Sequence, residues 1–225
     1  MDTAFKLITS IVRETVVPVV GESVRIAPDA LLWGTGLLSF LTQSYPLAIL
    51  FIAIIEITVG CRLTGSFIKA VRPDLQATAT SCRQGFSTGS LAFLAGATSV
   101  GAAGAAALPH FTLVLLTAVG VYLITGMYSK IDTLEALGES WTARIPTSLS
   151  LFVVVIATYI FGLYSNGCIT LGNVLLSLIA GTVLGLAAYF LNTALFGDEA
   201  TNFHGLPLLI NKIKEGEPIY VCSRS

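Results

Sequence analysis

Residues 145–197 are IPTSLSLFVVVIATYIFGLYSNGCITLGNVLLSLIAGTVLGLAAYFLNTALFG, and no charged residue interrupts them. A bilayer core of about 30 Å takes about 20 helical residues to cross, so this stretch holds two membrane spans and a turn. The stretch 84–129 is also long and uncharged. Each stretch therefore predicts a helical hairpin inside a membrane.

The composition of the whole chain agrees with this prediction. Hydrophobic residues make up 54% of the 225 residues, charged residues only 11%, and the mean hydropathy is +0.83, which excludes a water-soluble surface. Spans of a β-barrel would show segments of about ten residues with alternating polarity, whereas these apolar runs are continuous. We predict an all-α, polytopic transmembrane helical bundle of five or six spans arranged as helical hairpins.

The two ends of the chain are more polar than its middle. Residues 1–29 mix apolar and charged groups, and the spacing before Pro18 predicts an amphipathic N-terminal arm in the membrane interface. A cytosolic arm that packs on the protein's own loops is the alternative. Pro18 and Gly21 are expected to interrupt any long helix here. Residues 30–197 form the predicted transmembrane bundle, and residues 198–225 form a polar tail in which a short hairpin is plausible.

The number of spans depends on residues 30–55, which are uncharged but contain Pro46. They form either one span kinked at Pro46, or two helices of about 28–41 and 46–69 with Ser44 as the N-cap of the second. Six spans place all 12 Lys and Arg residues on one face, as the positive-inside rule favours. We therefore favour six, with both termini on the cytoplasmic or capsid-facing side and the turns 43–45, 109–110 and 165–168 opposite.

Small residues indicate where helices pack against each other. The predicted third helix, about 86–108, is rich in Gly and Ala, and GxxxG motifs begin at Gly85 and Gly181. Small residues let two backbones approach closely in lipid, so these faces are expected between helices of the bundle, with homo-oligomer contacts as the alternative. The predicted helix-packing positions are Gly85, Gly89, Gly96, Gly101, Gly181 and Gly185.

Glu56 is the most informative single residue for function. In the six-span topology it falls near the middle of the second helix, where an ionisable side chain is costly. Such a residue suggests an ion or proton path, or a buried pair that anchors helices. In the five-span topology Glu56 lies at the interface and needs no function.

No residue pattern supports a catalytic centre, a metal site or a cofactor. The chain contains no nucleophile elbow, no HExxH motif and no glycine-rich phosphate loop. His110 and His204 are the only histidines, and His110 is expected to be a solvated loop residue. The four cysteines are far apart and are expected to be isolated thiols, without a disulfide framework: Cys61, Cys82, Cys168 and Cys222. The net charge of −1 gives no basis for nucleic-acid binding.

The tail contains two short motifs, GLPLL at 205–209 and GEPIYVC at 216–222. This ending resembles that of small multi-spanning membrane proteins encoded by large DNA viruses of algae and protists. The resemblance implies a structural role in the lipid membrane inside an icosahedral capsid, where helices anchor in the bilayer and the tail meets capsid proteins. The implied docking positions are Leu206, Pro207, Ile219 and Tyr220.

Two functions follow from these observations. The first is a non-enzymatic membrane scaffold or anchor, whose partners are the lipid bilayer and other membrane or capsid proteins. The second is a small ion channel or transporter that uses Glu56 and the Gly-rich third helix as its pathway.

Overall fold

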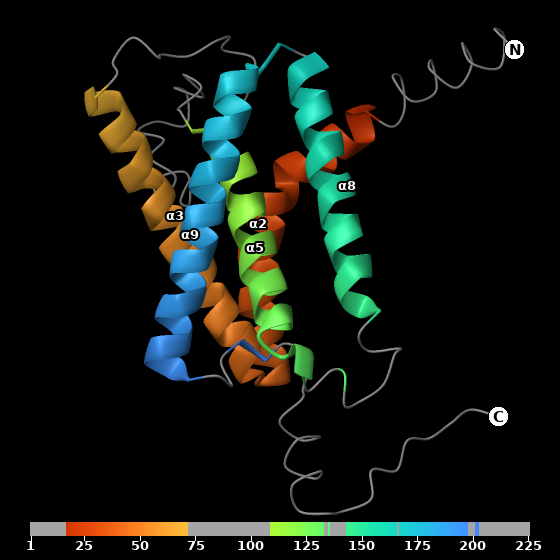
Figure 1. The fold of residues 1–225 in the computed structure, drawn as a ribbon, viewed down its shortest axis with the longest axis vertical. Helices are drawn as coiled ribbons and strands as arrows, with labels where there is room; N and C mark the ends of the chain where they lie inside the picture. The colour runs from red at the N-terminus through yellow and green to blue at the C-terminus, as the bar shows by residue number, and fades with distance from the viewer. Residues whose placement is uncertain are drawn as a thin grey trace, which may run out of the picture.

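The computed structural model describes residues 17–71, 109–132, 135, 143–165, 167–197 and 201–202. Within these ranges the chain forms long helices and no β-strand, which confirms the predicted all-α class (Figure 1). The helices are α2 (Val17–Thr42), α3 (Tyr45–Val71), α5 (Phe111–Tyr128), α8 (Arg144–Ser165) and α9 (Leu171–Phe196). The last four are long and apolar enough to cross a membrane, and the apolar part of α2, Ile26–Thr42, is shorter.

The contacts between helices fix their directions. Tyr45 at the start of α3 donates a hydrogen bond to the carbonyl of Phe196 at the end of α9, with 3.4 Å between the oxygens, so α3 and α9 are antiparallel. By contrast, α5 and α9 are parallel, because His110 contacts Ser177 at one end and Gly126 lies near Tyr189 at the other.

We name the two ends of the bundle by one residue each. The Cys168 end carries the turn between α8 and α9, and α3 also finishes there at Val71 (Figure 1, upper part). The Lys130 end carries the break between α2 and α3, the end of α5 and the end of α9 at Phe196.

These directions contradict the predicted placement of the three turns on one face. The six-span topology puts the turns 43–45, 109–110 and 165–168 on one face, but Gln43 and Ser44 lie at the Lys130 end and the other two turns lie toward the Cys168 end. Val71 and Pro109 lie toward the same end of the bundle, and residues 72–108 between them lie outside the described residues. The sequence argument placed the turns by the positive-inside rule, but basic residues border both ends of the described helices, with Arg62 and Lys69 toward one end and Lys130 and Arg144 at the other.

The two termini, which are predicted to lie on one side, are outside the described residues. Val17 lies at the Cys168 end and Phe196 at the Lys130 end, so the two outermost helices of the described chain begin and finish on opposite sides (Figure 1). The predicted third helix and its four glycines Gly85, Gly89, Gly96 and Gly101 lie outside the described residues.

The region around Pro46 follows the two-helix alternative, and the single kinked span is wrong. Gln43 has a left-handed backbone with φ of 51°, which breaks the helix, and α3 then begins at Tyr45. Pro46 lies in the first turn, where its missing N–H is not needed. The Ser44 carbonyl accepts from the Ala48 N–H at 3.1 Å, so regular helix bonding starts at once.

The start of α2 differs from the prediction. This helix begins at Val17 and continues through Gly21 and Pro28, so the expected interruption and the expected helix start near residue 28 are both wrong. A proline inside a helix removes one hydrogen bond and bends the axis without necessarily ending it. Figure 1 shows the first part of α2 inclined to the rest. Burial of Pro28 and Asp29 holds the segment in place, and residues 1–16 lie outside the described part.

The core lies where α3, α5 and α9 meet. Of the residues in the apolar window of α5, 61% are buried, against 17% for α8, so α5 is the central helix and α8 is peripheral. Thr201 and Asn202 are buried as well, and the Thr201 carbonyl lies 3.3 Å from the position that a Cβ on Gly126 would occupy. Thr201 therefore lies against the end of α5.

Candidate intramembrane polar site

Glu56 lies inside the apolar span of α3, Tyr45–Ile68, eleven residues after the helix begins. Its side chain is half-buried at the edge of the helix face that packs against the bundle. Glu56 is the only acidic residue in the four helices that can cross a membrane. A carboxylate in this position requires a polar partner, because hydrocarbon offers none.

That partner is Asn192, four residues before the end of α9. Its Nδ2 donates to Oε2 of Glu56 at 2.9 Å and also to the carbonyl of Ala188 at 2.9 Å. Asn192 is 0% exposed, so one helix presents a fully buried amide to the carboxylate of another. Hydrogen bonds of this kind between spans contribute on the order of 1 kcal/mol each.

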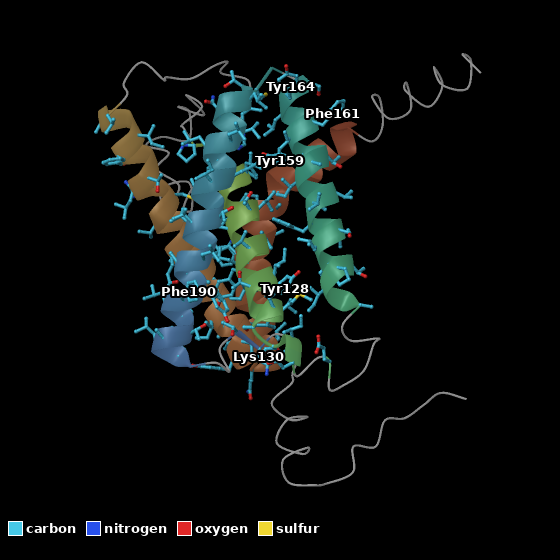
Figure 2. All side chains as sticks on the ribbon, viewed as in Figure 1. Tyr128, Lys130, Tyr159, Phe161, Tyr164 and Phe190 are labelled. Atoms are coloured by element: carbon cyan, nitrogen blue, oxygen red, sulfur yellow. The ribbon has the colours of Figure 1, made fainter. Side chains whose placement is uncertain are left out.

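Two tyrosines complete the surroundings of the carboxylate. Tyr122 of α5 is fully buried within electrostatic range of Glu56, and its ring meets the ring of Tyr189 edge to face with centroids 6.0 Å apart. Phe190, next in α9, points away from the bundle (Figure 2). Glu56, Asn192, Tyr122 and Tyr189, which we call the Glu56 cluster, therefore join α3, α5 and α9.

The Glu56 cluster offers limited chemistry. A carboxylate beside an amide and phenols can bind a proton or hold helices together, but it supplies no nucleophile next to a base. Among the described residues no group of three or more His, Cys, Asp or Glu side chains could hold a metal ion.

Beside this cluster, α5 and α9 touch backbone to backbone. A Cβ added at Gly181 would lie 2.7 Å from Cβ of Thr117 and 2.8 Å from the carbonyl oxygen of Val114. At Gly185 it would overlap the carbonyl oxygen of Ala118. Both positions of the predicted Gly181/Gly185 motif thus lie at an interface that has no room for a methyl group.

His110 is buried, which corrects its expected place in a solvated loop. It is 2% exposed because it caps the N-terminus of α5: its Nδ1 accepts from the Leu113 N–H at 3.4 Å, and its backbone N–H donates to Oγ of Ser177 at 2.9 Å. The ring meets Tyr159 of α8 edge to face with centroids 5.9 Å apart, and Figure 2 places Tyr159 among the helices. Burial lowers the pKa of His110 to about 4, although a backbone hydrogen bond opposes this shift.

Cys168 also departs from the expectation of isolated thiols, because it is disulfide-bonded. Cys61, in contrast, is a free and buried thiol. Distance along the sequence does not limit which cysteines meet in a folded bundle, so the wide spacing was a poor criterion.

Several predicted positions lie outside the described residues, and two contributors were missed. The positions outside the described residues are the packing positions Gly85, Gly89, Gly96 and Gly101, then His204, and the tail positions Leu206, Pro207, Ile219 and Tyr220. Asn192 and Ser177 were missed because neither is charged. A polar side chain inside an otherwise apolar span is the signal that identifies such residues, since it often hydrogen-bonds across helices.

Comparison with known proteins gives no relative from which a function can be transferred. The chain matches no protein family, no curated protein and no solved structure.

Proposed function

We propose that the protein is a non-enzymatic, multi-pass membrane protein whose packed helices serve as an anchor for structures at the membrane surface. The observation that carries this proposal is the hydrogen bond between Glu56 and the fully buried Asn192. The one acidic side chain of the four candidate spans is engaged in joining α3 to α9, which is a structural use of a costly group.

The packing around the Glu56 cluster supports an anchor over a pathway. A pore or transport path needs polar groups that face water along its length. The residues of α5 that face the bundle are instead buried and mostly apolar, and the α5–α9 contact leaves no space for a Cβ at Gly185. This argues for a bundle with a fixed arrangement.

The competing proposal is a small channel or transporter that uses Glu56. It is favoured by one observation, the half-buried state of a carboxylate inside a span. The two proposals differ in one measurable property. A channel or transporter moves a proton or ion past Glu56 from one side of the membrane to the other, and an anchor does not.

Reconstitution into liposomes distinguishes them. Purified protein is placed in vesicles loaded with a pH-sensitive dye, and proton flux is followed after a potassium gradient and valinomycin impose a membrane potential. An anchor gives no flux above protein-free vesicles, both for the wild type and for Glu56→Gln. Flux in the wild type that Glu56→Gln abolishes would contradict the anchor and establish transport.

The finer proposal, a component of a virion inner membrane that docks capsid proteins, rests only on the tail motifs. A photo-crosslinking amino acid at Tyr220, introduced into the full chain in its native membrane, tests it, with the same group at lipid-facing Phe190 as the matched control. A discrete adduct with a capsid protein from position 220 and none from 190 is expected. Equal adducts from both positions, or lipid adducts alone from position 220, would exclude a docking tail.

A further inference from the structure

One atom of the Asn192 side chain has no hydrogen-bond partner. The amide nitrogen Nδ2 uses both of its hydrogens, toward Oε2 of Glu56 and toward the carbonyl of Ala188, each at 2.9 Å. Two acceptors around one end of the amide identify that end as the nitrogen. The other end, Oδ1, is fully buried and accepts from no donor in the described part of the chain. A buried carbonyl oxygen in this state costs free energy, so the site lacks a donor.

Glu56 in turn has no positively charged neighbour among the described side chains. The helices packed against α3 are α2, α5 and α9. The ionisable side chains of α5 and α9 are all tyrosines, which are uncharged at neutral pH, and the buried ionisable residue described on α2 is Asp29. Arg62 of α3 is exposed and lies six residues after Glu56, about 240° around the helix axis. None of these groups neutralises a carboxylate, which is costly inside a span.

One proton supplies both missing parts. A carboxylic acid and a primary amide are complementary, because each presents one donor and one acceptor to the other. The bond from Nδ2 of Asn192 to Oε2 of Glu56 is in place, and a hydroxyl at Oε1 is the donor that Oδ1 lacks. The same proton removes the charge from the span, which lowers the cost of placing Glu56 there.

We infer that Glu56 is held as a neutral carboxylic acid whose Oε1–H donates to Oδ1 of Asn192, so that the ligand of the Glu56 cluster is a proton. The proton comes from water, and no other covalent bond forms or breaks. This inference rests on the contact that carries the proposed anchor and extends it, because α3 and α9 are then joined by two neutral hydrogen bonds. A neutral pair needs no counter-ion in the bilayer core.

Infrared spectroscopy of the full chain in lipid bilayers tests the protonation state at neutral pH. The difference spectrum of wild type minus Glu56→Gln should contain the carbonyl stretching band of a protonated carboxyl group. Glu135→Gln is the matched control, because Glu135 is exposed and lies outside the candidate spans, and its difference spectrum should contain carboxylate bands. Carboxylate bands alone in the Glu56→Gln difference spectrum would overturn the inference.

The role of Asn192 as the acceptor is tested with a second variant. In Asn192→Leu the acid hydroxyl loses its acceptor, so the carbonyl band should move to higher frequency, and an unchanged frequency would overturn the pairing. If Asn192→Leu does not fold, the Tm of Glu56→Gln answers the same question. The Gln amide offers Asn192 both a donor and an acceptor, so its Tm should equal that of wild type, whereas Glu56→Leu should melt at a lower temperature. Equal losses in Glu56→Gln and Glu56→Leu would contradict the inferred pair.

The spectrum and the liposome flux assay fail independently. A missing protonated band without proton flux would overturn this inference and leave the anchor standing. A protonated band together with flux that Glu56→Gln abolishes would overturn the anchor and leave the protonated pair standing.

Discussion

The two faces of α5 are packed in different ways. Toward α9, its backbone is in direct contact with another backbone, since a Cβ on Gly185 would meet the carbonyl of Ala118. Toward α8, a Cβ on Gly120 would meet the outer ring atoms of Phe152, which belong to a side chain that can turn. The α5–α9 contact is therefore rigid and the α5–α8 contact is adjustable, which agrees with the low burial of α8.

The largest effect should come from filling the rigid contact. Gly185→Leu forces two backbones apart, so we expect a loss of about 3 kcal/mol or more and a fall in Tm of about 10 °C in detergent. Gly172→Leu is the matched control on the same helix, because nothing lies within 4 Å of its added Cβ. The melting temperature of each purified variant measures the difference, and equal values would contradict the rigid contact.

The second-largest effect should come from removing the side-chain amide of Asn192 at the Glu56 cluster. Asn192→Leu leaves the Glu56 carboxylate without its donor and should cost about 2 kcal/mol. Glu56→Leu combined with Asn192→Leu should recover part of that loss, because no unpaired polar group then remains. The free energies of unfolding of the two single variants and the double variant, measured by thermal unfolding, give the coupling energy. Strictly additive losses would show that the two side chains do not act as a pair.

A smaller effect is expected from His110, which contacts both α8 and α9. Its pKa is about 4 in the folded protein, below the ordinary value of 6.5, so the folded state holds the neutral ring. The contribution of this group to stability is complete above pH 6.5 and is lost as the pH falls. Between pH 6.5 and 5.5 the loss is about 1 kcal/mol. His110→Asn retains a capping residue and should remove this pH dependence from the melting curves.

The smallest effect should come from the adjustable contact. Gly120→Ala should cost about 0.5 kcal/mol, because rotation of the Phe152 ring relieves most of the overlap and Ala favours the helix. Phe152→Leu in the same chain should restore the wild-type Tm. No side-chain substitution is expected to rescue Gly185→Leu in this way, so rescue there would remove the distinction between the two faces.

The sequence predicted individual helices better than their directions. The break at Gln43–Ser44 and the turn after Ser165 were found because Pro46 and the uncharged polar residues mark them. The turns were placed wrongly because the prediction relied on loop charges, and basic residues such as Arg62 and Lys130 border both ends of the bundle. Pro28 was misjudged because a proline bends as well as ends helices.

Only part of the candidate site could be predicted from the sequence. Glu56 stands out in the sequence because charge is rare in spans, and its neighbours Asn192 and Tyr122 do not, because both residue types also occur singly on lipid-facing helices near the interface. The contact between Glu56 and Asn192 comes from the antiparallel arrangement of α3 and α9, which brings together residues 136 positions apart. No local pattern encodes a contact at that separation.

The same separation determines how long after Glu56 the residue Asn192 is synthesised. At about 5–20 residues per second, Asn192 leaves the ribosome roughly 7–27 seconds after Glu56. Throughout this interval α3 has reached the insertion machinery without the amide that its carboxylate needs. The contact that joins α3 to α9 through Glu56 and Asn192 can therefore form only after α9 has been made.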